Sequence, residues 1–252
     1  MAMPVLGLQV YTVRQSLSAD FVGTLRRVKE IGYDAVELCG TGPYGGAEVR
    51  EICDDLGLRV AGMHIGLDAL ERDLPGCIEL AHELGMGNLV CPYLPEDRRR
   101  AREDWLRVAR DLDSMGRQCR KAGLRLSYHN HSFEFVRFGD RYALDLLFEG
   151  SSPQNLLSEL DTYWVKHGGA DPVEYVRKYA GRIKILHCKD MAPDRDRSFT
   201  EVGSGVLDWR AIHEAALEAG VEWYCVEQDV CAGDPMESAR ISAKFMRSEL
   251  GL

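Results

Sequence analysis

Residues 180–190 read AGRIKILHCKD, and this stretch shows most clearly the pattern from which the fold is predicted. The preceding residues 171–180 open with Asp171-Pro172, which is typical of the first turn of a helix. Gly181 follows that segment, and a glycine can take the left-handed conformation that closes a last helical turn. An apolar, β-rich run then leads directly into polar residues. The stretch therefore predicts a helix, a glycine turn and a buried strand with a polar end.

The same pattern recurs along the chain. Other β-rich runs follow the glycines Gly32, Gly57, Gly85, Gly123, Gly150 and Gly220, and with the opening run 6–11 they make eight predicted strands. The predicted helices are 18–31, 46–56, 75–84, 97–122, 141–149, 171–180, 208–219 and 234–250, with N-caps at Ser18, Asp171 and Asp234. Strict alternation favours parallel strands joined by crossover helices. An open, doubly wound sheet would favour a Gly-rich turn after its first strand, where this chain has VYTVR. We predict an α/β protein, with residues 1–252 forming a single (β/α)8 TIM barrel domain.

The amino-acid composition limits the classes of binding partner and the cellular compartment that we expect. The chain has 252 residues, with 40 acidic against 31 basic side chains and a formal charge of -9, which disfavours a nucleic-acid partner. Its eight cysteines are scattered without a CxxC, so we interpret them as small buried hydrophobes in a reducing compartment. Residues 1–5 lack the layout of a signal peptide, and no apolar stretch approaches the roughly 18 residues of a membrane span. The sequence predicts a cytoplasmic protein without a membrane partner.

Polar residues gather where the predicted strands end. Side chains alternate along a strand, so Ile183, Ile185, His187 and Lys189 share one face, with the polar pair last. The same reasoning brings a further set of polar side chains to the strand ends: Gln9, Tyr11, Glu37, His64, His129, His131, Glu159, Asp161 and Glu227. Burying so many ionisable groups together is costly without a compensating cation. The pattern predicts a metal site, with a hydrogen-bonded structural cluster as the alternative.

Five stretches resemble the sugar phosphate isomerase/epimerase superfamily, the xylose isomerase-like TIM barrels. YHNHSFEF at 128–135 is similar to the YHNHxFEF signature of one branch. LDTYW at 160–164, LHCKD at 186–190, GSGVLDW at 203–209 and VEQD at 226–229 match the rest in family order.

The resemblance implies one divalent ion, held by a Glu, Asp, His, Glu set from strands five to eight. By position, Asp161, His187 and Glu227 are the last three ligands. Many members carry Glu-x-His at the end of strand five, where this chain has His129-Asn130-His131. Either His129 takes the first position or Glu134 reaches back to it, and we favour Glu134 because carboxylates suit hard ions. Mn2+ is the expected ion, with Mg2+, Co2+ and Zn2+ as alternatives.

The family chemistry implied is removal of a proton next to a sugar carbonyl through a metal-stabilised enediolate, which predicts an isomerase or epimerase. His129 and His131 are the candidate acid and base, and Glu227 is a candidate for proton transfer. Contacts to a small-molecule sugar or sugar derivative are expected from Tyr11, Glu37, His64 and Lys189, with Phe133 and Trp164 as apolar walls. The resemblance is compatible with a homo-oligomer but does not decide the oligomeric state.

Other functions compete with this prediction. The same site could serve a dehydratase or lyase acting on a keto-inositol or a 3-keto-glycoside. An endonuclease IV-like nuclease would need a three-zinc cluster and a basic face, whereas the arginine run at 98–102 is flanked by acidic residues. A non-catalytic sugar-binding barrel would need no metal. The loop 203–205 offers backbone N–H groups as a weak candidate for a substrate phosphate.

Overall fold

Eight parallel strands close into a barrel, which confirms the predicted fold. The computed structural model describes residues 3–252, so Met1 and Ala2 of the N-terminal stretch considered above lie outside the described residues. The barrel runs in the order β1-β12-β9-β8-β5-β4-β3-β2. Its strands are β1 (Val5–Gln9), β2 (Ala35–Leu38), β3 (Arg59–His64), β4 (Asn88–Cys91), β5 (Arg125–His129), β8 (Leu156–Asp161), β9 (Ile183–Cys188) and β12 (Trp223–Val226).

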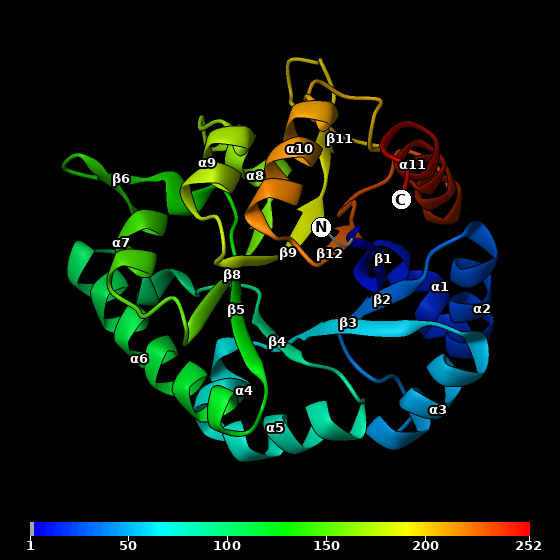
Figure 1. The fold of residues 1–252 in the computed structure, drawn as a ribbon, viewed down its shortest axis with the longest axis horizontal. Helices are drawn as coiled ribbons and strands as arrows, with labels where there is room; N and C mark the ends of the chain where they lie inside the picture. Colours follow the sequence, from blue (N-terminus) through cyan, green and yellow to red (C-terminus); the bar gives the residue numbers. More distant parts are fainter. Residues whose placement is uncertain (1–2) are drawn as a thin grey trace.

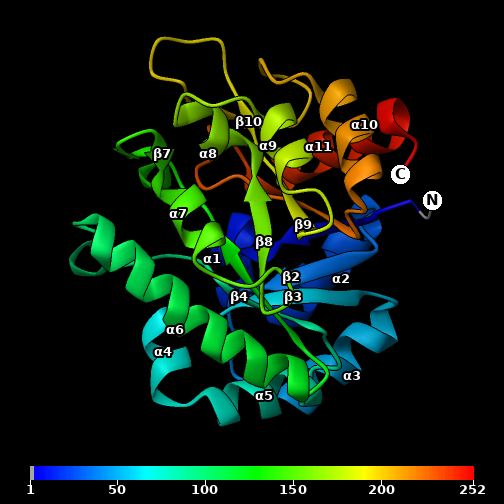
Figure 2. The ribbon, with the colours of Figure 1, turned by 60° about the vertical axis from the view of Figure 1, so that its left-hand side comes forward.

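Helices surround the strands, and the chain colours run once around the barrel (Figure 1). Their bounds are α1 (Arg14–Ala19), α2 (Phe21–Ile31), α3 (Gly46–Leu56), α4 (Leu67–Arg72), α5 (Leu74–Glu83), α6 (Arg102–Lys121), α7 (Ala143–Glu149), α8 (Thr162–His167), α9 (Pro172–Lys178), α10 (Trp209–Ala219) and α11 (Pro235–Leu250). The short 3-10 helices are η1 (Val10–Val13), η2 (Glu96–Arg98) and η3 (Phe133–Phe135). Two small hairpins pair β6 (Arg137–Phe138) with β7 (Arg141–Tyr142) and β10 (Asp190–Met191) with β11 (Phe199–Thr200). Figure 2 shows the loop that follows β10 rising beyond the barrel strands.

Two local predictions at the N-terminus are wrong. The first strand ends at Gln9, because the Gln9 side chain accepts a hydrogen bond from the Tyr11 N–H and opens η1. Tyr11 therefore lies in a helical turn after the strand. Ser18 lies inside α1, and the cap of the next helix is Asp20, which accepts from the Gly23 N–H at 2.9 Å. The predicted caps Asp171 and Asp234 are confirmed.

Most of the repeat glycines take the expected left-handed conformation. Positive φ values occur at Gly32, Gly57, Gly85, Gly123, Gly181 and Gly220. Gly150 differs, with φ -78°. A Cβ at Gly150 would lie 2.9 Å from the Cβ of Ala109 and 3.0 Å from the Leu146 carbonyl oxygen. Close packing against α6, rather than chain reversal, explains this glycine.

An apolar layer fills the inside of the barrel beneath the strand ends. It consists of the buried side chains Ala35, Ala61, Val90, Ile185 and Cys225. Ile185 and Cys225 share their strand faces with His187 and Glu227, so alternation carries the polar groups into the barrel mouth above this layer.

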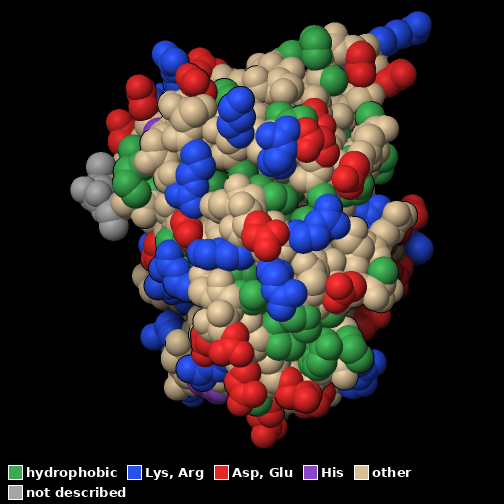
Figure 3. Space-filling model, turned by 90° about the vertical axis from the view of Figure 1, so that its right-hand side faces the viewer, with side chains coloured by type: hydrophobic (Ala, Val, Ile, Leu, Met, Phe, Trp, Pro, Cys, Tyr) green, Lys and Arg blue, Asp and Glu red, His purple; other side chains and the backbone are tan. Residues whose placement is uncertain are grey.

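The outside of the protein bears mixed charges. Figure 3 shows Lys and Arg interspersed with Asp and Glu over one face, without a broad basic patch there. All eight cysteines are free. Five of them are buried as predicted, but Cys39, which follows the end of β2, is exposed, and Cys77 and Cys231 are half-buried. Within residues 3–252, no helix has the length and apolar character needed to cross a membrane.

Candidate metal centre and substrate pocket

The strand ends bring four predicted site residues together. His129, Asp161, His187 and Glu227 each offer one ligand atom, and these atoms lie within 4.8 Å of one another. Asp161 and His187 are register partners on β8 and β9, and Glu227 follows β12 on the other side of β9. All four side chains are buried. The arrangement contains the predicted Asp161, His187 and Glu227, and strand five contributes His129.

Glu134 lies outside this group, although we favoured it as the ligand from strand five. It sits in η3, where its Oε1 accepts from the Tyr128 hydroxyl at 2.6 Å and its Oε2 accepts from the His131 N–H at 2.8 Å. Both oxygens are therefore engaged in holding the turn after β5. Burial raises the pKa of Glu134 to about 8. The geometry favours the other alternative, in which His129 occupies the strand-five position.

A second group of possible ligands lies beside the first. His64, His129, Glu159 and His187 also offer atoms within 4.8 Å of one another. The Nε2 of His187 lies 2.9 Å from Glu159 Oε1 and 2.6 Å from Glu37 Oε2, while its Nδ1 lies 3.0 Å from Glu227 Oε2. His187 therefore connects the two groups.

Two predicted substrate contacts are engaged in this network. Glu37 is fully buried and accepts a hydrogen bond from Gln9 Nε2 at 3.0 Å. The Nε2 of His64 lies 2.8 Å from Glu159 Oε1, and His64 also lines the pocket described below. Glu159 was placed on the inner face by strand alternation but given no role. Its position beside three histidines makes it part of the site.

Lys189 lies beneath the pocket rather than in its wall. Its Nζ is 3.1 Å from Asp161 Oδ2, 2.8 Å from Glu227 Oε2 and 2.9 Å from Asp229 Oδ2, and the residue is fully buried. Burial alone would lower the pKa of Lys189, but these three carboxylates raise it well above its ordinary value. The ammonium thus offsets part of the carboxylate charge. Lys189 is not among the lining residues of the pocket, and its contact with a substrate hydroxyl stays a prediction. Asp229 was missed, although strand alternation from Glu227 would have pointed to it.

Electrostatics shape the protonation of this cluster. Burial and the neighbouring Glu159 raise the pKa of Glu37 to about 7, and burial raises that of Asp161 to about 6. Burial alone would lower the pKa of His187, but Glu159, Glu37 and Glu227 raise it well above its ordinary value. Burial likewise opposes protonation of His64, but Glu159 and Glu37 raise its pKa. Both imidazoles therefore favour the charged form.

The cluster fits a divalent cation. Five carboxylates (Glu37, Glu159, Asp161, Glu227 and Asp229) face three groups that favour positive charge, namely Lys189, His187 and His64. Two buried carboxylate oxygens of the cluster, Glu37 Oε1 and Glu159 Oε2, accept no hydrogen bond from the described residues. Carboxylate and imidazole donors suit the divalent first-row metals. The unsatisfied carboxylate oxygens and the types of donor both favour a bound dication.

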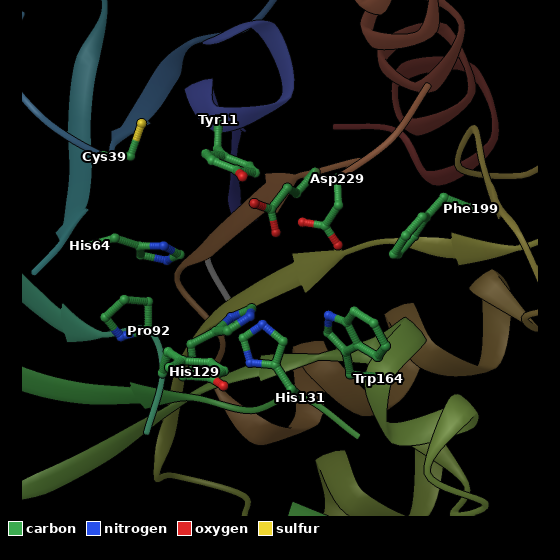
Figure 4. A pocket seen from close by; sticks show the side chains of 11 residues that line it. Tyr11, Cys39, His64, Pro92, His129, His131, Trp164, Phe199 and Asp229 are labelled. Atoms are coloured by element: carbon green, nitrogen blue, oxygen red, sulfur yellow. The ribbon is translucent and has the colours of Figure 1, made fainter. Parts of the chain in front are cut away.

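A pocket of about 510 Å³ opens beside this cluster. Figure 4 shows side chains from several separate elements directed into it. The lining residues are Tyr11, Cys39, His64, Pro92, Tyr93, His129, His131, Trp164, Phe199, Glu227 and Asp229. Phe133 supports the wall from behind, since its ring stacks on His131 with centroids 5.5 Å apart. The metal-ligand candidates Glu227 and His129 thus face a cavity of the size that small-molecule ligands occupy.

Asp190 holds the loop between β11 and α10. Its Oδ2 accepts from the N–H groups of Gly203 at 3.0 Å and Gly205 at 3.1 Å and from Trp209 Nε1 at 2.7 Å. Its Oδ1 accepts from the Leu207 N–H at 3.2 Å. Of the N–H groups considered for a substrate phosphate, those of Gly203 and Gly205 are therefore already bound by a protein carboxylate. Asp190 was missed as a functional residue, although both stretches that it joins were recognised in the sequence.

Metal affinity should separate His129 from Glu134. We expect His129→Gln to weaken binding of Mn2+ by about 10-fold or more, because it removes an imidazole from the ligand group. Glu134→Gln should change the affinity much less, since both Glu134 oxygens are bound elsewhere. Isothermal titration of the metal-free variants checks this. A larger loss in Glu134→Gln would restore that residue as the ligand.

Comparison with known proteins agrees with the fold. The family model described as xylose isomerase-like TIM barrel matches residues 25–249. The chain belongs to the xylose isomerase-like TIM barrel family.

The individual relatives have low sequence identity to this chain. An inosose dehydratase of Clostridium beijerinckii is 29% identical over 168 residues, covering 59% of this chain and 56% of that protein, so the match spans little more than half of the relative's length. An inosose dehydratase of Geobacillus kaustophilus is 26% identical over 263 residues, covering 88% and 85% of the two chains. A solved sugar phosphate isomerase/epimerase from Parabacteroides distasonis has a TM-score of 0.83 and 27% identity, covering 98% of this chain and 95% of the other.

Proposed function

We propose that this protein is a divalent-metal-dependent dehydratase or lyase that acts on a sugar-derived ketone. The observation that carries the proposal is the convergence of His129, Asp161, His187 and Glu227 beside the pocket. Mn2+ is the expected ion. When bound, the ion would supply positive charge beside the oxygen that becomes negative as the neighbouring proton leaves.

Dehydration is favoured over our first expectation of isomerisation or epimerisation. The relatives from C. beijerinckii and G. kaustophilus are both named inosose dehydratase. The reaction removes a proton from the carbon next to the carbonyl and expels the hydroxyl from the following carbon. A carbon–carbon double bond forms between these carbons, and the proton and hydroxyl leave together as one molecule of water.

His131 is the proposed proton acceptor. It lines the pocket and belongs to neither group of ligand candidates. Its Nδ1 is buried and has no hydrogen-bond partner among the described residues, so this ring nitrogen is available to accept a proton. Asp229 also lines the pocket, and burial raises its pKa. Asp229 stays a carboxylate paired with Lys189. The proton taken up by His131 would be returned to the leaving hydroxyl, while Glu227 orients the substrate beside the metal centre.

Isomerisation or epimerisation is the second candidate. It needs the same proton removal, with the proton returned to carbon instead of loss of water. The P. distasonis structure, named as a sugar phosphate isomerase/epimerase, supports it. The two reactions differ in the fate of the neighbouring hydroxyl.

One experiment distinguishes the candidates. The Mn2+-loaded protein is incubated in D2O with a keto-inositol or a 3-keto-glycoside, and products are followed by NMR and mass spectrometry. We expect loss of water, abolished by EDTA and strongly reduced in His131→Gln. Deuterated isomers without loss of water would support the second candidate instead. Neither exchange nor elimination across the panel would contradict the proposed chemistry.

A further inference from the structure

The pocket has aromatic walls on several sides. Tyr11 from η1, Tyr93 after β4, Trp164 from α8 and Phe199 from β11 all line it, and Figure 4 shows the labelled rings around one cavity. The Trp164 and Phe199 rings lie 5.6 Å apart at 82°, forming a corner. Phe199 is held from behind by Tyr163, with ring centroids 4.3 Å apart. Such rigid aromatic faces offer contact area to the C–H face of a cyclic ligand.

The charged groups in the same wall are carboxylates. Glu227 and Asp229 line the pocket, and within the described part of the chain its lining contains neither lysine nor arginine. A phosphate group beside these carboxylates would meet like charge, whereas phosphate recognition ordinarily uses Arg, Lys or free backbone N–H groups.

The cationic side chains close to the pocket already interact with other groups of the protein. Lys189 is fully buried against three carboxylates. Arg14 stacks on Tyr11 at 4.2 Å and donates to the Tyr11 carbonyl. Arg99 stacks on Phe133 at 3.7 Å and donates to the Leu94 carbonyl.

The backbone N–H groups of loop 203–205 also donate hydrogen bonds within the protein already. Gly203 and Gly205 donate to Asp190, and the Ser204 N–H donates to the Glu201 carbonyl. A Cβ at Gly205 would lie 2.2 Å from Asp190 Oδ1, which shows how closely the carboxylate fills this loop.

We propose that the pocket selects an uncharged, unphosphorylated cyclic polyol or glycoside, whose C–H face packs in the corner formed by Trp164 and Phe199. This inference rests on the proposed function only in taking this pocket as the substrate site. The carboxylates and imidazoles face the ring hydroxyls, and the aromatic corner determines specificity for a neutral ring.

Binding of matched ligand pairs tests the inference. The probes are a keto-inositol and its monophosphate, and a 3-keto-glucoside and its 6-phosphate, titrated into the Mn2+-loaded protein and into the EDTA-treated protein. Calorimetry and Trp fluorescence report binding without requiring turnover. We expect the neutral ligands to bind about 10-fold or more tightly than their phosphate esters, because the esters place negative charge beside Glu227 and Asp229.

Substitutions at Phe199 test whether the aromatic corner causes the preference for neutral ligands. Phe199→Ala should weaken binding of the neutral ligands about 10-fold through loss of aromatic contact, whereas Phe138→Ala, in the separate β6–β7 hairpin, should not. Phe199→Lys should raise the relative affinity for the esters. Equal or tighter binding of the esters by the wild type, or unchanged affinity in Phe199→Ala, would overturn the inference.

The test keeps the two proposals apart. Binding of the neutral ligands with the expected preference but without elimination or exchange would remove the proposed function and leave the inference. Turnover confined to the phosphate esters would remove the inference and leave the proposed chemistry.

Discussion

Asp161→Asn is expected to lower kcat/KM by about 10^3-fold, because charge stabilisation by a bound metal is worth several kcal/mol and each 1.36 kcal/mol is tenfold in rate. Asp161 has two separate tasks. Its Oδ1 accepts from the Trp164 N–H at 2.8 Å and caps α8, while its Oδ2 faces Lys189 and His129. Asparagine retains the capping oxygen and removes the negative charge. The barrel should therefore stay folded.

Thermal unfolding and steady-state kinetics measured together check this result. Asp171→Asn is the matched control, since Asp171 also caps a helix but lies in neither ligand group. We expect that control to keep near wild-type activity. Wild-type turnover in Asp161→Asn would show that this carboxylate is dispensable, and an unfolded Asp161→Asn variant would assign it a structural role instead.

Asp190→Ala should have the largest effect on stability. The substitution leaves five donors without their acceptor: the N–H groups of Met191, Gly203, Gly205 and Leu207 and the indole of Trp209. Each buried donor left unsatisfied costs about 1–3 kcal/mol, so we expect the free energy of unfolding to fall by about 4 kcal/mol. Phe199 lies in the hairpin that begins at Asp190, so substrate binding should weaken as well.

Urea denaturation provides the measurement. Asp208→Ala is the control, because Asp208 caps α10 through one hydrogen bond, to the Ala211 N–H, and such a cap contributes about 1 kcal/mol. If Asp190→Ala were no less stable than Asp208→Ala, the loop 203–209 would not depend on this carboxylate.

Local patterns in the sequence were sufficient for the fold and for much of the site. The alternation along residues 183–189 predicted that His187 and Lys189 point into the barrel, since side-chain direction in a strand is set by parity alone. The glycine repeat predicted the strand positions because most of its glycines take the left-handed conformation after a helix and before the next strand.

Contacts between distant segments were not predictable in the same way. The choice between His129 and Glu134 depends on the η3 turn, in which Glu134 accepts from Tyr128 and from the backbone of His131. The burial of Lys189 depends on carboxylates contributed by β8 and by the segment after β12. Neither the strand period nor helix capping carries information about such pairings, so the roles given to Lys189 and Glu134 needed the structure.

The existence of the proposed metal site is tested by metal binding to the purified protein. The protein is stripped with EDTA, dialysed and titrated with Mn2+ by calorimetry, with elemental analysis of the loaded sample. We expect saturable binding of one ion per chain, weakened strongly in Glu227→Gln and His187→Ala while both variants remain folded. Absence of saturable binding in the wild type, or equal binding in these variants, would contradict it.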